Sequence, residues 1–385
     1  MIPYGKQDIN QEDIDAVINV LQSDFLTQGP KVPAFEQCVA EFGGSKYGCA
    51  VNSATSALHI ACLALGLGKD DELWTSPNTF VASANCGLYC GARVDFVDID
   101  PHTYNLCPDK LEQRLISAKR MGKLPKIVVA VHLSGQSCDM KRIFKLSKTY
   151  GFKIIEDASH AIGGKYSGSV IGSCKYSDIT VFSFHPVKIV TTAEGGIALT
   201  NDSHYFEKMM LFRSHGITRD EKVMQGVSDG PWYYEQVDLG FNYRMTELQA
   251  ALGLSQMTRL EEFVTTRHRL AKRYDDKLKE LPIILPFQSE NTYSSFHLYV
   301  VRLNLEIIKK SHKQVFQELR YRGIGVNLHY IPVHIHPYYQ TMGFKLGDFP
   351  EAEKYYGEAI SIPIYHGLKN DEQDSVIQAI TEVLV

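Results

Sequence analysis

A lysine and an aspartate follow two apolar runs with a spacing that suits one kind of chemistry. Asp157 closes the run Phe152–Asp157, and Lys188 comes 31 residues later, at the end of Val181–Lys188. The pair Gly195-Gly196 follows soon afterwards. A lysine amine forms a Schiff base with pyridoxal phosphate (PLP), and a carboxylate keeps the pyridine nitrogen protonated so that the ring accepts electrons. The two residues together predict a PLP site, whereas a lone lysine would indicate only a surface charge.

A small-residue segment, Asn52–Leu58, joins a predicted strand to a predicted helix. Small side chains let the backbone approach an anion, and a helix N-terminus offers free N–H groups and the positive end of the helix dipole. Ala54, Thr55 and Ser56 are therefore predicted to hold a phosphate. An ordinary Ser/Thr helix cap is the alternative, but the nearby lysine motif favours the phosphate site.

Other candidates lie in the loops after the predicted strands. Phe80 is placed to stack on a planar cofactor, or else it is a core residue. His160 comes three residues after Asp157 and is predicted to be a catalytic residue near the ring hydroxyl of the cofactor, with a structural role as the alternative. The alternative for Asp157 is that it caps the following helix. Ser183 is predicted to donate to the phosphate, and His185 to orient the site or simply to pack. Burial beside a cationic ring lowers a lysine pKa, as attack on a carbonyl requires.

The elements that must position these residues alternate between strand and helix. Seven β-branched runs predict strands: Gly48–Val51, Glu72–Thr75, Val94–Asp98, Ile127–Val131, Lys153–Asp157, Ile179–Ser183 and Gly196–Leu199. Between them, four stretches predict helices: Ser56–Leu65, Ala82–Cys90, Pro108–Lys119 and Met140–Tyr150. This alternation predicts an α/β fold with a largely parallel sheet covered on both faces.

The pattern changes after Gly240. Apolar residues at helical intervals predict one long helix over Met245–Tyr274. A strand near Phe296–Leu303, a helix near Lys310–Arg322 and a last helix over Asp371–Val385 predict a smaller α+β domain. We therefore expect a large domain over residues 13–260 and a small domain formed by residues 1–12 and 261–385.

Composition excludes several classes of function. A net charge of −4 gives no basic surface for nucleic acid. No apolar run is long enough to cross a membrane, and the first residues contain no apolar signal-peptide core, so we expect a soluble cytoplasmic protein. The eight cysteines form no C-x-x-C motif and are expected to be reduced. The histidines that follow Tyr330 lack an accompanying carboxylate, so no metal is predicted. Gly66-Leu67-Gly68 lacks the third glycine of a dinucleotide fingerprint.

Several of these motifs together resemble a known family. They are Val51–Leu58, Asp157–His160, Ser183–Lys188, Glu194–Gly196 and Gly240–Thr246. They resemble the DegT/DnrJ/EryC1/StrS sugar aminotransferases, which implies the aspartate aminotransferase fold (PLP-dependent transferases of fold type I) with a mostly parallel seven-stranded sheet. Phe25–Gly29 and Phe212–Gly216 look like the branch of that family that acts in pseudaminic acid biosynthesis. Many relatives carry Gln at the position of His160, and this branch tends to have His.

The resemblance implies a role for each matching residue. Lys188 would carry the cofactor and move protons, Asp157 would face the pyridine nitrogen, and Asn242 would reach the phosphate from the partner subunit of a homodimer with shared active sites. The residues implied to line the sugar-nucleotide site are Tyr4, Asp24, Phe25, Leu26, Thr27, Ala54, His185, Asn327, Leu328, His329 and Tyr330. The implied substrates are L-glutamate and a UDP-linked 4-keto-6-deoxy sugar.

Three alternatives remain. A PLP-dependent sugar dehydratase of the same fold has histidine in place of the lysine, so Lys188 opposes it. A nonenzymatic regulator on this scaffold is opposed by the intact Asp157 and Ser183. A nicotinamide-dependent oxidoreductase is opposed by the absent glycine fingerprint. Within the family, an aminotransferase acting on another UDP- or dTDP-linked keto-sugar also remains open.

Overall fold

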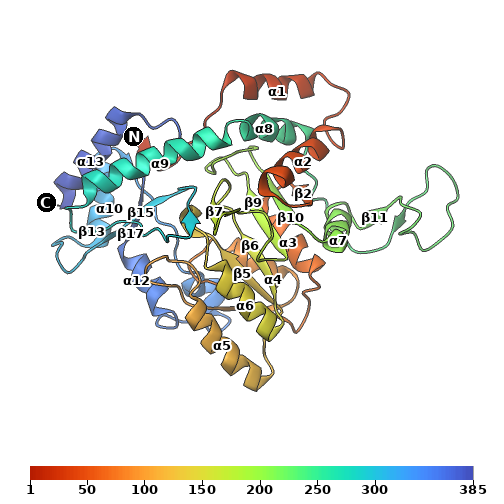
Figure 1. Ribbon diagram of the computed structural model, residues 1–385, viewed down its shortest axis with the longest axis horizontal. Helices are drawn as coiled ribbons and strands as arrows, with labels where there is room; N and C mark the ends of the chain where they lie inside the picture. Colours follow the sequence, from red (N-terminus) through yellow and green to blue (C-terminus); the bar gives the residue numbers. More distant parts are fainter. Residues whose placement is uncertain (385) are drawn as a thin grey trace.

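A seven-stranded sheet forms the centre of the molecule in the computed structural model, which describes residues 1–384 (Figure 1). Its strand order is β2-β10-β9-β6-β5-β3-β4. The strands are β2 (Tyr47–Val51), β3 (Glu72–Thr75), β4 (Arg93–Phe96), β5 (Ile127–Val131), β6 (Lys153–Asp157), β9 (Ile179–Ser183) and β10 (Gly196–Thr200). Only β10 runs antiparallel to its neighbours in this sheet. The seven predicted strands and the mostly parallel arrangement are confirmed.

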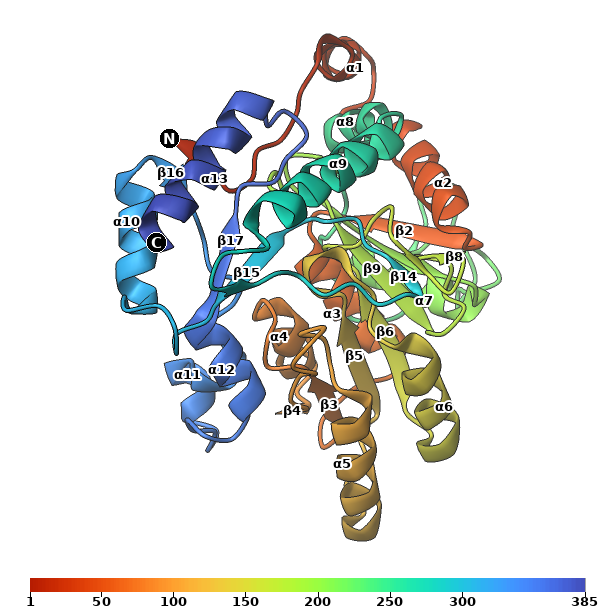
Figure 2. The same ribbon diagram turned by 60° about the vertical axis from the view of Figure 1, so that its left-hand side comes forward.

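Helices cover both faces of this sheet, which explains why its strands are apolar throughout. In β5, Ile127, Val129 and Val131 pack on one face, and Val128 and Ala130 pack on the other. The first face carries α3 (Ala54–Ala64), α4 (Ala82–Tyr89) and α7 (Ser203–Arg213). The second carries α2 (Lys31–Gly43), α5 (Pro108–Met121), α6 (Met140–Tyr150) and α8 (Glu247–Met257) (Figure 2).

The single long helix predicted over Met245–Tyr274 is wrong. The chain forms α8 and then α9 (Leu260–Leu278), with a break at Thr258 and Arg259. Arg259 has a nonhelical backbone (φ −105°, ψ 4°), and its guanidinium contacts Asp8 and Asp13 at 2.6 Å each. Asp13 belongs to α1 (Gln11–Leu21), which Asn10 begins with a capping box. The break therefore ties the start of the chain to the α8–α9 junction.

The C-terminal part of the chain has its own sheet and a separate apolar cluster, whereas Tyr339, Phe349, Ala352 and Tyr355 pack with the core on the α3 face of the large sheet. Strands β13 (Ile283–Ile284), β15 (Tyr299–Leu303) and β17 (Ala359–Ile362) form a three-stranded sheet, and β1 (Ile2–Pro3) pairs with β16 (Ile324–Gly325). The helices here are α10 (His312–Tyr321), α11 (Pro337–Gln340), α12 (Pro350–Glu358) and α13 (Asn370–Leu384). The predicted last helix is thus present, although its expected end at residue 385 lies outside the described residues.

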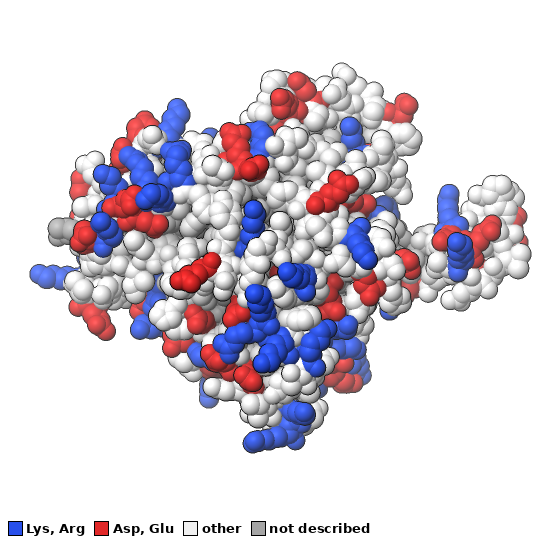
Figure 3. Space-filling model, in the orientation of Figure 1, with Lys and Arg blue, Asp and Glu red and all other residues white. Residues whose placement is uncertain are grey.

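Two smaller sheets complete the described structure. One contains β7 (Lys165–Tyr166), β8 (Ser169–Val170) and β14 (Thr292–Tyr293). The other contains β11 (Ile217–Thr218) and β12 (Glu235–Gln236), and it forms an arm that projects far from the body in Figures 1 and 3. Lys and Arg are interspersed with Asp and Glu over the face drawn in Figure 3. None of the helices within residues 1–384 is long and apolar enough to span a bilayer. All eight cysteines are free thiols.

Candidate functional site

Three neighbouring parallel strands of the large sheet end at one cavity. Val131, Asp157 and Ser183 are the last residues of β5, β6 and β9, and all three line a cavity of about 750 Å³. In open α/β sheets, ligands bind beyond the carboxyl ends of the strands. The sheet topology therefore brings together residues that are far apart in the sequence.

Asp157 is buried at this edge and is held by two serines. Its carboxylate accepts hydrogen bonds from Ser83 Oγ at 2.6 Å and from Ser159 Oγ at 2.6 Å, and the backbone N–H of Ser159 donates at 3.1 Å. Ser83 lies on α4 and was not predicted, because the sequence gives no sign that α4 packs against the end of β6. These contacts fix the direction of a carboxylate that also lines the cavity.

Lys188 reaches the same cavity from the loop after β9. The turn that carries it is closed by its backbone N–H, which donates to the His185 carbonyl at 2.8 Å. Burial lowers the pKa of the Lys188 amine to about 8, although the negative charge of Asp157 opposes this shift. A much larger fraction of the amine than in an ordinary lysine is therefore neutral and nucleophilic near neutral pH. His185 and Glu194 stand at the exposed edge of the cavity.

The N-terminus of α3 forms another wall. Ser53 Oγ caps the helix by accepting from the Ser56 backbone N–H at 3.1 Å, while Ala54, Thr55 and Ser56 line the cavity. The first N–H groups of a helix have no intrahelical acceptor and so remain available to an anion. A Cβ atom on Gly196 would lie 2.4 Å from the Ala54 nitrogen, so only glycine allows β10 to approach this turn so closely.

Three histidines and a tyrosine lie beside Lys188. His160 and His297 have ring centroids 4.4 Å apart, and Tyr330 Oη lies 3.0 Å from His160 Nε2. Burial lowers the pKa of His329 to about 3, with a further contribution from the Lys188 charge. Burial likewise lowers the pKa values of His160 and His297 well below the usual value. All three imidazoles are therefore neutral at physiological pH.

Aromatic side chains complete the cavity. The Phe80 ring is 57% exposed and lies near Tyr330, with ring centroids 6.1 Å apart. Tyr4 also lines the cavity, and its ring centroid is 5.1 Å from that of His329. An exposed aromatic ring at the cavity wall offers a flat apolar surface to a planar ligand.

Some of the predicted residues do not line the cavity of their own chain. Asn327 and Leu328 are absent from the cavity wall, although Asn327 Nδ2 lies 3.4 Å from His329 Nε2, and Asn242 is exposed outside the cavity. The loop Asp24–Thr27 is also exposed, and the Leu26 carbonyl accepts from the Glu247 N–H at the start of α8. The remaining predicted residues line one cavity: Tyr4, Ala54, Thr55, Ser56, Phe80, Asp157, His160, Ser183, His185, Lys188, His329 and Tyr330.

His297 is a cavity residue that the sequence did not reveal. It lies just before β15, and the only available signal was a histidine at the start of a predicted strand. Its Nδ1 atom is buried and has no hydrogen-bond partner among the described residues. It therefore adds an unpaired polar atom close to Lys188 and His160.

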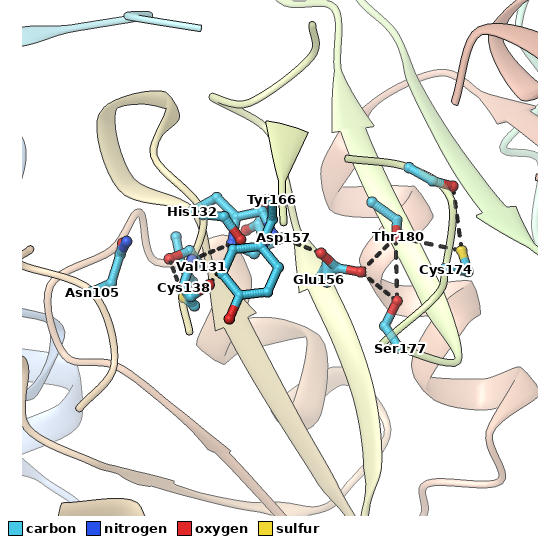
Figure 4. Close-up of polar contacts among 12 residues, drawn as sticks. Asn105, Val131, His132, Cys138, Glu156, Asp157, Tyr166, Cys174, Ser177 and Thr180 are labelled. Carbon is cyan, nitrogen blue, oxygen red and sulfur yellow. Dashed lines mark hydrogen bonds and ion pairs between the residues drawn. The ribbon is translucent and has the colours of Figure 1, made fainter. Parts of the chain in front are cut away.

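A second buried carboxylate lies on the other face of the same strand. Glu156 precedes Asp157 in β6, and it is bonded to His132 Nε2 at 2.7 Å, to Thr180 Oγ1 at 3.1 Å and to Ser177 Oγ (Figure 4). Burial raises its pKa, but the His132, Ser177 and Thr180 contacts outweigh burial and hold the pKa below the usual value. This carboxylate joins β5, β6 and β9 beneath the cavity.

The cavity fits pyridoxal phosphate. A helix N-terminus with free N–H groups suits the phosphate, a buried carboxylate suits the ring nitrogen, and the Lys188 amine in the same cavity suits the covalent link. Gly196 lets β10 pack directly against the α3 turn that offers these N–H groups. We find no group of three His, Cys, Asp or Glu side chains within residues 1–384 that is arranged to hold a metal ion.

Comparison with known proteins agrees with this geometry. The model of the DegT/DnrJ/EryC1/StrS aminotransferase family matches residues 7–381. Spore coat polysaccharide biosynthesis protein SpsC of Bacillus subtilis is 38% identical over all of this chain and 97% of its own length. A UDP-4-amino-4,6-dideoxy-N-acetyl-beta-L-altrosamine transaminase of Campylobacter jejuni is 36% identical over all of this chain and 98% of its own length.

A solved structure gives the same result for the fold. Helicobacter pylori PseC, described as an aminotransferase involved in the biosynthesis of pseudoaminic acid, superposes with a TM-score of 0.89. Its sequence is 32% identical, and the match covers all of this chain and 99% of PseC. The predicted fold, that of the PLP-dependent transferases of fold type I, is confirmed.

Proposed function

The chain belongs to the DegT/DnrJ/EryC1/StrS aminotransferase family, and on this premise we propose that it transfers the amino group of L-glutamate to a nucleotide-linked 4-keto-6-deoxy sugar. It is a PLP-dependent sugar aminotransferase. The observation that carries the proposal is that Lys188, Asp157 and the α3 N-terminus line one cavity. The products are 2-oxoglutarate and the 4-amino sugar.

The proposed sugar is UDP-2-acetamido-2,6-dideoxy-β-L-arabino-hex-4-ulose, an intermediate of pseudaminic acid biosynthesis. The names of the Campylobacter and Helicobacter relatives support this choice. Another UDP- or dTDP-linked keto-sugar is the second candidate, because SpsC, whose name refers to a spore coat polysaccharide, is as similar to the chain as they are.

The cofactor site is formed by residues from several elements. Ala54, Thr55, Ser56 and Ser183 would hold the phosphate of PLP, Asp157 would pair with its ring nitrogen, and Phe80 would cover the ring. When bound, PLP supplies an electron sink that lets a proton leave the carbon bearing the amino group. Lys188 would hold PLP covalently and, once its amine is free, would move that proton.

The chain's own groups are suited to these tasks. The lowered pKa of Lys188 leaves an amine able to accept a proton and return it near neutral pH. Asp157 is kept in place by Ser83 and Ser159, so that its charge is already oriented before a ligand binds. His160, His297 and His329 remain neutral and add no positive charge beside Lys188.

We propose that a second copy of the chain completes each site. Lys188 is the sole Lys or Arg among the lining residues, all of which belong to the described part of the chain. A sugar nucleotide carries two phosphates, which are usually bound by cations. Asn242, the loop Asp24–Thr27 and the projecting arm are exposed and available to a partner's cavity (Figure 1). This arrangement supports a homodimer with shared active sites.

We also propose the division into residues 13–260 and residues 1–12 with 261–385. A separate cluster of buried apolar side chains, drawn entirely from Leu270 onward, supports this division. Ile2 packs against that cluster, in keeping with the assignment of the first residues to the small domain.

The experiment that tests the function is a substrate panel. The protein is incubated with PLP, L-glutamate and UDP- or dTDP-linked 4-keto-sugars, and the products are identified by NMR. We expect a 4-amino sugar and an equal amount of 2-oxoglutarate. A visible absorption band that glutamate leaves unchanged, with no amino sugar formed, would instead indicate a PLP-binding regulator.

A further inference from the structure

The hydrogen bond between His160 and Tyr330 has a fixed direction. Tyr330 Oη and His160 Nε2 are 3.0 Å apart, and either atom might donate if the pair is taken alone. The other ring nitrogen removes this ambiguity, because the Ser134 backbone N–H donates to His160 Nδ1 at 3.2 Å. A backbone N–H can only donate, so Nδ1 must be the unprotonated nitrogen.

The tautomer of His160 follows from this contact. Burial, reinforced by the charge of Lys188, lowers the pKa of His160 well below its usual value, so the ring is neutral. A neutral imidazole with an unprotonated Nδ1 carries its proton on Nε2. His160 Nε2–H therefore donates to Tyr330 Oη, and the tyrosine oxygen accepts.

The hydroxyl proton of Tyr330 has no acceptor among the described residues. Its hydroxyl has no second hydrogen-bond partner among the described residues. Burial raises the pKa of Tyr330, so the phenol stays protonated across the physiological range. Its side chain lines the cavity beside the exposed ring of Phe80. The remaining O–H therefore has its acceptor in the cavity, where the ligands bind.

The backbone conformation of Ser134 fixes the direction of its N–H group. Ser134 has φ +60°, in the left-handed region that residues other than glycine adopt at a cost. Its neighbours hold it there, because the Leu133 N–H donates to Asn105 Oδ1 at 2.9 Å and the Leu298 N–H donates to the Ser134 carbonyl at 3.3 Å. Held in this conformation, Ser134 points its N–H group at His160 Nδ1.

We propose that Tyr330 donates a hydrogen bond to an oxygen atom of the ligand bound beside Lys188, and that the Ser134 N–H sets this direction through His160. The inference rests on the proposed function, since it assigns a role within that site. Two oxygens have the required chemistry: the ring oxygen of the cofactor and the oxygen at the reacting carbon of the sugar. Tyr330 is then a catalytic residue, and His160 and Ser134 are positioning residues.

Other titratable groups face Tyr330, and a test must separate their effects. Asp157 at the end of β6 and Tyr4 near the N-terminus both act on it electrostatically. Lys188, His297 and His329 line the same cavity. Measurements on the Tyr330 hydroxyl are therefore made with all five groups unchanged.

The first test reads the tautomer directly in the unmutated protein. Long-range ¹H–¹⁵N spectra of the protein without cofactor report which imidazole nitrogen carries a proton, and a His160→Gln variant identifies the signal. We expect a neutral ring protonated on Nε2. A proton on Nδ1, or on both nitrogens, would overturn the proposal without any reference to activity.

The second test uses Tyr330→Phe in the PLP-loaded protein without substrates. If the acceptor is the ring oxygen of the cofactor, the pH midpoint of the visible absorption band rises by about 1 pH unit, because a hydrogen bond to a charged oxygen is lost. If the acceptor is the sugar oxygen, the band midpoint stays constant, and kcat/KM for the sugar falls about 10-fold or more while the glutamate half-reaction is unchanged. The proposal fails if neither quantity changes.

Tyr274→Phe is the matched control. The Tyr274 hydroxyl donates to the Pro363 carbonyl at 2.8 Å inside the C-terminal core and does not line the cavity. This variant loses one buried phenol hydrogen bond, and we expect the band midpoint and both half-reactions to match the unmutated protein. Failure of the proposed function would appear as the absence of any amino sugar with the unmutated enzyme, which is distinct from an unchanged Tyr330→Phe variant.

Discussion

Two adjacent carboxylates on β6 have opposite surroundings. Glu156 faces the side of the sheet covered by α5 and α6, where His132, Ser177 and Thr180 contact it (Figure 4). Asp157 faces the other side, where Ser83 and Ser159 orient it at the wall of a 750 Å³ cavity. Successive residues of a strand point to opposite faces of the sheet, so one strand supplies a carboxylate to each face.

The contrast separates a structural role from a chemical one. The partners of Glu156 are Thr180 in β9, Ser177 just before β9 and His132 just after β5, so its charge links β6 to both neighbouring strands. Asp157 is oriented by its partners and still reaches the space where a ligand binds. Burial and a perturbed pKa alone do not indicate function, since Glu156 has both and lines no cavity with Lys188.

Replacing the lysine of the cavity should have the largest effect. We expect Lys188→Ala to lower turnover by about 10⁴-fold or more, because both the covalent link and the proton carrier are lost. Steady-state assays with glutamate and the keto-sugar measure this. Lys153→Ala is the control, since Lys153 pairs with Asp178 at 3.0 Å at the far end of β6. Turnover of Lys188→Ala within tenfold of the unmutated enzyme would disprove the assignment.

Replacing each carboxylate by its amide tests whether Asp157 and Glu156 have different roles. Asp157→Asn should lower kcat by about 10²–10³-fold, because an oriented charge is removed from the reacting site. Glu156→Gln should lower the free energy of unfolding by about 1–3 kcal/mol, since charge-assisted hydrogen bonds are weakened.

Urea unfolding gives the free energy of unfolding of each variant, and steady-state kinetics of the same preparations give kcat. The folded fraction of Glu156→Gln should retain most of its activity. If Glu156→Gln lost activity without losing stability, the division of roles between the two faces of β6 would be wrong.

The pH dependence of cofactor capture tests the state of the Lys188 amine. Its pKa is lowered to about 8, and a lysine is neutral above its pKa. The rate at which the cofactor-free protein binds PLP should therefore rise with pH up to about 8 and then level off. Stopped-flow absorbance follows this rate. A rate that keeps rising toward pH 10 would contradict a lowered pKa.

The smallest effect is expected from two serines on the two faces. Ser183→Ala should weaken PLP binding by about 2–10-fold, the effect of one lost hydrogen bond, and leave stability unchanged. Ser177→Ala should lower the free energy of unfolding by about 1–2 kcal/mol, because Glu156 loses a donor, and leave PLP affinity unchanged. Equilibrium titration and urea unfolding separate the two results.

Much of the fold could be predicted from the sequence because its strands are short, apolar and separated by clear helices. The predicted range Ile127–Val131 coincides with β5, and Lys188 and Asp157 reach the same cavity as expected. The break at Arg259 was not predicted, because the helical spacing of apolar residues continues through it. The residues that bind the Arg259 guanidinium, Asp8 and Asp13, lie about 250 residues earlier in the chain. Ser83 and His297 were missed for the same reason, because only tertiary packing brings them to the site.

Borohydride reduction followed by peptide mapping identifies the lysine that holds PLP. The PLP-loaded protein is reduced, digested and searched for the pyridoxyl-modified peptide by mass spectrometry. We expect one modified residue, Lys188, within the peptide that contains Ser183 and His185. A stable adduct on another lysine, or none at all in protein that forms the amino sugar, would contradict it.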